Sequence, residues 1–166
     1  MMKTLFSILT LTFGLVMGLA PLPQAHAADA TIAGITFSGA WARASTGGGR
    51  PSAAYLTIIN KGASDVLSGA SSPLAERVEI HQSKMENGVM RMNKAEPLEI
   101  PNGAKLAMKP GGYHIMIMRL KQPLKMGDTV TLTLHLKNAG DVTIHAPVKH
   151  AAAAHGHGES MKHKMK

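Results

Sequence analysis

The sequence of 166 residues has no cysteine, and its aromatic residues are limited to three Phe, two Tyr and one Trp. Without Cys there is no disulfide to stabilise the fold and no thiolate to bind a metal, which excludes the blue-copper centre of an electron-transfer protein. Burial and hydrogen bonding must hold the fold together, and a soft metal ligand has to be Met. The absence of Cys also argues against a lipid-anchored bacterial lipoprotein.

The charge of the chain is unbalanced toward positive, with a formal net charge of +8. A basic chain can bind nucleic acid or an acidic surface. Here the Lys and Arg residues of the central part are scattered from Arg43 to Lys137, with no aromatic platform among them. We therefore expect no nucleic acid among the partners.

The first residues have the organisation of a secretory signal peptide. Met1-Met2-Lys3 is a short positive start, Thr4 to Ala20 is apolar and uncharged, and Ala25-His26-Ala27 is a small-x-small cleavage pattern. We predict a signal peptide over 1–27 and a mature chain from Ala28, located in the periplasm and not spanning the membrane. The alternative is an uncleaved anchor, although the apolar run is near the lower limit of about 17 residues for a span.

The mature chain is rich in Met and His and is patterned as short strands separated by turn signals. Nine Met and eight His remain after residue 27. Strands at this spacing predict a single all-β domain over 28–148, a β-sandwich or barrel. A weak helical candidate covers Pro73 to Arg77. The expected strands are 32–44, 53–60, 66–70, 77–82, 88–93, 113–120, 128–137 and 141–147.

Alternation along the strands separates the metal-binding residue types from the core. In Tyr113–Met118, His114 and Met116 share the face opposite the aliphatic residues. His81 likewise lies opposite its aliphatic neighbours, and Met92 follows a turn that folds its strand back beside His81. Imidazole and thioether groups on one face suit Cu(I), because soft sulfur selects that ion and imidazole binds copper generally.

Each of these residues taken alone has an ordinary explanation. Met commonly fills gaps in cores, and a single His is usually a surface or hydrogen-bonding residue. His135, on the polar face of 129–136, is expected to be such a solvent-facing histidine. It is the joint pattern of His and Met opposite the aliphatic face that favours a metal site.

The spacing of the four residues is H-x10-M-x21-H-x-M, which resembles the signature of the PCu(A)C family of periplasmic copper chaperones. The likeness extends over 32–136. It implies a cupredoxin-like Greek-key β-sandwich or barrel with an exposed Cu(I) site made by His81, Met92, His114 and Met116. The flanking segments that agree are Trp41-Ala42-Arg43-Ala44, Ala54-Tyr55-Leu56-Thr57, Val78-Glu79-Ile80-His81 and Pro110-Gly111-Gly112-Tyr113-His114.

The resemblance also implies a role. Members of that family are implicated in delivering copper to the Cu(A) centre of cytochrome c oxidase, often beside a thiol-bearing assembly factor, so the expected partners are periplasmic copper donors and acceptors. We expect that the protein is not an enzyme, since the sequence shows no set of catalytic residues. A copper buffer or resistance protein without a dedicated acceptor is the main alternative, and a copper-free structural β-domain is the last.

Two further groups of residues are candidate ligands. Met85, Met90 and Met118 lie near the four residues in sequence and could be alternative ligands, or filler at the core or its rim. The segment 149–166 has too few apolar residues for a core, so we expect a flexible tail. Its histidines are candidate Cu(II) ligands or simply solvated side chains; they are His150, His155, His157 and His163.

Overall fold

The computed structural model describes residues 29–45, 47 and 49–150, which form strands and no helix. The all-β prediction is therefore confirmed. None of these residues forms a helix long and apolar enough to cross a membrane. The strands are β1 (Ala30–Ile32), β2 (Ile35–Arg43), β3 (Ser52–Asn60), β4 (Asp65–Ser71), β5 (Ala75–Glu86), β6 (Val89–Lys94), β7 (Leu98–Ile100), β8 (Lys105–Ala107), β9 (Tyr113–Leu120), β10 (Thr129–Leu136) and β11 (Gly140–Lys149).

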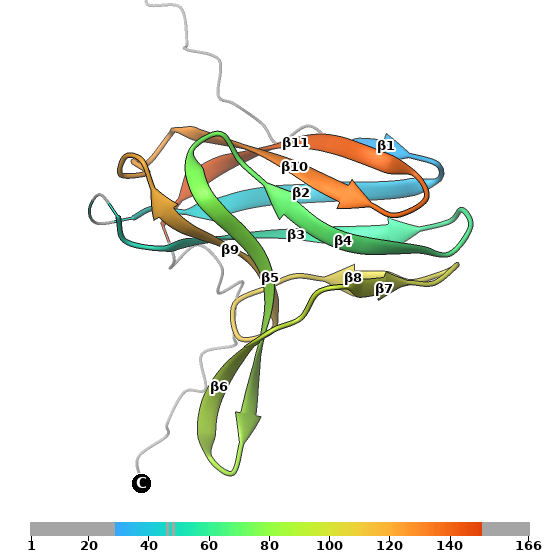
Figure 1. The fold of residues 1–166 in the computed structure, drawn as a ribbon, viewed down its shortest axis with the longest axis horizontal. Helices are drawn as coiled ribbons and strands as arrows, with labels where there is room; N and C mark the ends of the chain where they lie inside the picture. The colour runs from blue at the N-terminus through green and yellow to red at the C-terminus, as the bar shows by residue number, and fades with distance from the viewer. Residues whose placement is uncertain (1–28, 46, 48, 151–166) are drawn as a thin grey trace, which may run out of the picture.

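The strands pair in the order β6-β5-β9-β3-β2-β11-β10-β4-β7, with β1 beside β2 and β8 beside β3. Strand β11 connects β6-β5-β9-β3-β2 on one side of this order with β10-β4-β7 on the other. It pairs with β10 along its length, and its last residues, Val148 and Lys149, pair in parallel with Ala42 and Arg43 of β2. Figure 1 shows β11, β10 and β4 packed over β2 and β3, while β5 and β6 extend away from this body as a two-stranded arm.

The core is aliphatic, as the alternation along the strands predicts. One face of most strands turns inward, and the fully buried side chains come from β2, β3, β5 and β9 as well as from β4, β7, β10 and β11. The arm residues of β6 are exposed throughout. The body is therefore stabilised by burial, and the arm by its strand pairing and its closing turn. The largest fully buried residues include Phe37, Ile58, Leu67, Ile80, Ile115, Ile117, Leu132, Leu134 and Ile144.

The predicted strand 32–44 is wrong in one respect, because a tight turn at Ala33-Gly34 divides it into β1 and β2. Both turn residues have positive φ, 49° and 81°, which is the geometry of a type I′ hairpin. Ala is unusual there. The turn packs closely against residues 61–62, since the Gly34 carbonyl accepts a hydrogen bond from the Lys61 N–H at 2.9 Å, and a Cβ at Gly62 would stand 2.1 Å from the Ala33 oxygen.

The helix predicted over Pro73–Arg77 is also wrong. Strand β5 already begins at Ala75, which pairs with Leu120 of β9. Strands β7 and β8 were not predicted, because three residues each are too few to show a period. They exist through pairing with β4 and β3.

Candidate metal site

The four predicted ligands come from three neighbouring strands, β6, β5 and β9. The register pairs His81 directly with His114, and it pairs Ser83, two residues along β5, with Met92. Met116 lies two residues beyond His114 on the same side of β9. Residues directly opposite or two apart lie on one face of a sheet, within reach of long side chains. The structure therefore brings His81, Met92, His114 and Met116 to one face.

The site has a buried floor and an exposed edge. The opposite faces of β5 and β9 carry Ile80 and Ile115, both 0% exposed, so the core lies directly beneath the site. His114 is 4% exposed, whereas Met92 is 51% exposed. The resemblance implies an exposed site, and this holds for the thioether of Met92 but not for the imidazole of His114.

One nitrogen of each histidine is hydrogen-bonded and the other has no partner. His81 Nε2 donates to Glu79 Oε2 at 2.8 Å, and His114 Nδ1 donates to the carbonyl of Gly112 at 2.9 Å. Among the described residues, the buried side-chain nitrogen and oxygen atoms without a hydrogen-bond partner are His81 Nδ1 and His114 Nε2. An unsatisfied buried polar atom costs about 1–3 kcal/mol. Two such atoms on directly paired residues are expected where a metal ion would be bound.

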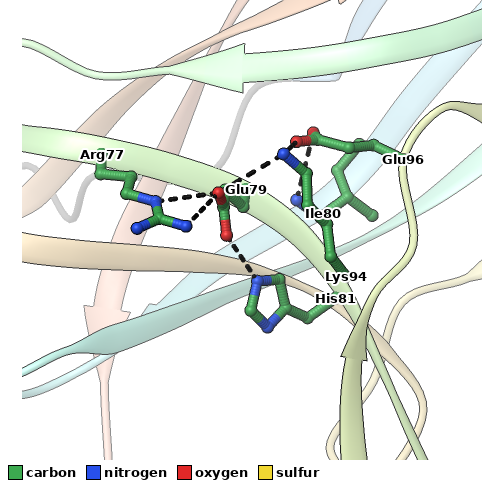
Figure 2. Close-up of polar contacts among 6 residues, drawn as sticks. All are labelled: Arg77, Glu79, Ile80, His81, Lys94 and Glu96. Atoms are coloured by element: carbon green, nitrogen blue, oxygen red, sulfur yellow. Dashed lines mark hydrogen bonds and ion pairs between the residues drawn. The ribbon is translucent and has the colours of Figure 1, made fainter.

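Glu79 is a member of the site that the sequence analysis did not single out. Figure 2 shows its carboxylate between the Arg77 guanidinium and the His81 ring. Hydrogen bonds from His81 and Arg77, with the nearby charge of Lys94, lower the pKa of Glu79 to about 2 although burial opposes this. The carboxylate is thus charged at neutral pH and fixes the tautomer of His81 with the lone pair on Nδ1. The sequence signal that could have indicated Glu79 is its position two residues before His81, which puts both side chains on one face of a strand.

A tight turn before β9 positions His114. Pro110 and Gly111 occupy the centre of a turn closed by a hydrogen bond from the Gly112 N–H to the Lys109 carbonyl, 3.0 Å, and Gly111 has a φ of 79°. This is the geometry of a type II turn, which needs Gly at that position. The Gly112 carbonyl that holds the His114 ring is fixed in turn by the backbone N–H of Ser83, at 3.0 Å.

An aromatic row covers the inner side of His114. The Tyr55 ring lies 6.4 Å from the His114 ring and 4.5 Å from the Trp41 ring, measured between centroids. Burial lowers the pKa of His114, and the nearby His81 ring and Arg43 guanidinium lower it further, against the opposing hydrogen bond to the Gly112 carbonyl. Its imidazole is therefore neutral at neutral pH, which is the form that binds metals.

The distances fit a shared ion. The ring centroids of His81 and His114 are 6.1 Å apart. A metal–nitrogen bond of about 2 Å on each ring places two centroids that share one ion about 5.1 Å apart at a tetrahedral angle and about 6.3 Å apart in a linear arrangement. No group of three or more His, Cys, Asp or Glu side chains that could hold an ion lies within the described part of the chain. Any ion here therefore depends on thioethers, which favours a soft metal.

The remaining candidates are distributed more widely. Met85 and Met90 are directly paired near the end of the arm, and Met118 of β9 lies opposite Arg77. His135 is partly exposed, and both of its ring nitrogens are hydrogen-bonded, to Asp141 and Ser71. His150 is exposed just after β11. His155, His157 and His163, and the predicted signal peptide 1–27, lie outside the described residues.

Comparison with known proteins places the chain in a family. The family model "LpqE-like: Putative lipoprotein LpqE-like" matches residues 35–148. The chain belongs to the LpqE-like family. A relative from Leifsonia xyli subsp. xyli (strain CTCB07), "Putative lipoprotein Lxx21020", is 33% identical over 123 residues, which cover 73% of each protein.

Solved structures share the fold of this LpqE-like chain. The apo PCuAC domain of PmoF2 is 25% identical with a TM-score of 0.65, over 78% of this chain and all of that one. The solution structure of Cu(I)-DR1885 from Deinococcus radiodurans is 32% identical with a TM-score of 0.57, over 73% and 80%. The cupredoxin-like β-sandwich predicted from the sequence is thereby confirmed.

Proposed function

We propose that the protein is a copper carrier of the bacterial periplasm that binds Cu(I) through His81 Nδ1, His114 Nε2 and the thioethers of Met92 and Met116. The observation that carries the proposal is the pair of buried, unpartnered imidazole nitrogens on facing strands. Support comes from two similar structures that hold copper, the copper-bound PCuAC domain of PmoF2 and Cu(I)-DR1885.

The donor set favours Cu(I) over other ions. Neutral imidazole and thioether ligands suit a soft monovalent ion, and carboxylates that would attract Ca²⁺ or Mg²⁺ do not enter the set. Thioethers cannot form disulfides, so such a site keeps working in an oxidising compartment. The predicted signal peptide and the lipoprotein names of the relatives support a location outside the cytoplasm.

Transfer follows from the shape of the site. The His114 ring is buried and the His81 side chain is 16% exposed, whereas Met92 stands at the exposed edge. A partner thiolate can therefore approach from the side of Met92 and replace the neutral thioethers by ligand exchange, which needs no acid, base or nucleophile. In this proposal the protein is a carrier and not an enzyme.

The acceptor is the finer part of the proposal. The resemblance to PCu(A)C chaperones implies periplasmic donors and acceptors, with the Cu(A) site of cytochrome c oxidase and a thiol-bearing assembly factor as candidates. The C-terminal tail, including His150, His155, His157 and His163, would collect Cu(II). A buffer that sequesters copper without an acceptor is the second candidate function, and the exposed Met92 edge favours the carrier.

An anaerobic Cu(I) titration against a chromophoric chelator tests the site. The parent chain from Ala28 is compared with Met92→Ala, His114→Ala and Met116→Ala. We expect one tightly bound equivalent in the parent and weaker binding in each variant. His135→Ala is the matched control, because both nitrogens of that ring already have partners. Unchanged binding in all three site variants would show that the ligand assignment is wrong.

A transfer assay separates the carrier from the buffer. The Cu(I)-loaded chain is mixed with a purified thiol-bearing acceptor, and the copper content of each protein is measured after separation. A carrier transfers its copper to the acceptor, whereas a buffer retains it against the same thiol.

A further inference from the structure

The arm formed by β5 and β6 exposes several large apolar side chains. Among the described residues, the exposed large hydrophobic side chains are Met85, Val89, Met90, Met92 and Met126, and all except Met126 belong to this arm. Their exposed fractions are 64% for Met85, 53% for Met90 and 51% for Met92. Soluble proteins usually bury such residues or use them in binding.

The arm places its three methionines on one face. Met85 pairs directly with Met90, and Met92, two residues along β6, is the diagonal neighbour of Met85. These three thioethers therefore share one face of the arm. Glu86, Lys84 and Arg91 fall on the other face, because Lys84 is paired with Arg91 and alternates with Met85.

The thioether face is continuous with the candidate metal site. His81, Ser83 and Met85 follow each other at every second position of β5, so the three methionines lie on the same side of the sheet as the histidines. In Figure 1 the arm projects away from the body. The exposed fractions of its three methionines show that this face is accessible to an approaching molecule. The charged residues of β5 and β6 on this side are Arg77, Glu79 and Lys94. Arg77 and Lys94 both pair with Glu79, and Lys94 also pairs with Glu96.

We propose that Met85, Met90 and Met92 form a second, outer site for a soft monovalent cation, Cu(I) or Ag(I). Three neutral thioethers without imidazole or carboxylate suit these ions and not Cu(II), Zn²⁺ or Ca²⁺. The inference rests on the proposed function in one respect, namely that the outer site supplies the inner one. Met92 belongs to both sets, so an ion held by the outer thioethers reaches the histidines without leaving the protein.

The outer site is tested where the inner site has been removed. In the variant His81→Ala/His114→Ala, prepared as the whole chain from Ala28 with [methyl-13C]methionine, Ag(I) is added and the methyl resonances are followed. Single Met→Leu variants assign the resonances. We expect the signals of Met85, Met90 and Met92 to shift together along one saturable curve. Met126, equally exposed at 55% but outside the arm, is the matched control and should not follow that curve.

A second variant gives the magnitude. Met85→Leu and Met90→Leu are added to the His81→Ala/His114→Ala variant, and they keep the apolar volume of the arm. They should weaken Ag(I) binding at Met92 by about tenfold or more, which corresponds to about 1.4 kcal/mol. The same loss should not follow from Met126→Leu. If Met85 and Met90 shift no more than Met126, or if the double substitution leaves Met92 unaffected, the outer site does not exist.

The two proposals fail separately. In the parent chain, the ring signals of His81 and His114 report the inner site, and the methyl signals of Met85 and Met90 report the outer one. Rings that ignore Ag(I) and Cu(I) while the methyl groups respond would overturn the proposed function and leave the outer site standing. The opposite result would overturn the outer site alone.

Discussion

His81 Nε2 lies 2.8 Å from Glu79 Oε2, and Glu79 is only 7% exposed. Arg77 and Lys94 are both within ion-pair distance of the same carboxylate, so its charge is balanced. Because Nε2 is occupied, the lone pair of His81 is directed from Nδ1. A hydrogen-bonded carboxylate fixes the orientation of a ligating imidazole and raises its basicity.

The first prediction concerns this positioning carboxylate. Glu79→Gln removes the charge and allows the amide to turn a donor toward His81, so the ring loses its fixed tautomer. We expect Cu(I) affinity to fall by about tenfold or more, the usual effect of losing such a partner. Competition with a chromophoric chelator measures the change.

Glu96→Gln is the matched control for that experiment. Glu96 is a nearby, largely buried acid that pairs with Lys94 at 2.7 Å but makes no contact with His81 among the recorded hydrogen bonds and ion pairs of the described residues. It should leave the Cu(I) affinity within about threefold of the parent, as expected for a neighbour outside the ligand network. Equal losses in both variants would indicate a general effect of charge and not positioning.

The second prediction is that His114 lowers the stability of the metal-free protein. Its Nε2 is buried without a partner, and the Gly112 carbonyl that it contacts would still accept the Ser83 N–H. His114→Phe should therefore raise the free energy of unfolding of the apo protein by about 1 kcal/mol, while abolishing Cu(I) binding. Urea unfolding measures the first effect and chelator competition the second.

His135→Phe provides the contrast. Both nitrogens of His135 are hydrogen-bonded, at 2.8 Å to Asp141 and 2.9 Å to Ser71, so its replacement should not stabilise the apo protein. Stabilisation by both substitutions would mean that Phe is favourable in these strands for reasons unrelated to a vacant ligand position.

The sequence predicted which residues share a face of the sheet better than it predicted where the strands begin and end. Alternation placed Ile115 and Ile117 in the core and His114 on the other face, because a strand has a strict period of two. The Asn87-Gly88 signal predicted the hairpin that brings Met92 beside β5, and both residues have the positive φ of a type I′ turn.

The features that the sequence did not reveal depend on tertiary contacts. The Ala33-Gly34 turn packs against Gly62, which lies in the loop after β3, and the sequence alone does not reveal that contact. His114 is buried and Met92 is exposed, although alternation places both on the same face of the sheet. The role of Glu79 becomes visible only in the structure, where Arg77 and His81 both donate to its carboxylate.

The third prediction uses Trp41 as a reporter. It is the single Trp of the chain, and Tyr55 stands between its ring and that of His114. An ion bound at His114 should change Trp41 emission, because Tyr55 packs against both rings, and the change should saturate at one equivalent of Cu(I). An anaerobic fluorescence titration tests this. His114→Ala should remove the saturable part, and Met126→Leu should retain it. Undisturbed emission during proven binding would place the ion away from His114.

The last prediction concerns acid stability. Burial would raise the pKa of Asp65, but hydrogen bonds from the backbone N–H groups of Asn138, Val66 and Ala139, all within 2.9 Å, bring it below its usual value. Because the folded pKa is the lower one, this carboxylate stabilises the protein above the unfolded pKa of about 3.9, and the contribution is lost as pH falls below it. Asp65→Asn should cost about 2 kcal/mol at neutral pH and flatten the decline of stability in acid, both measured by urea unfolding at several pH values. Asp128→Asn, at an exposed acid with one backbone hydrogen bond, should cost only about 0.5 kcal/mol. A decline in acid that is equally steep with and without Asp65 would assign the acid sensitivity to other groups.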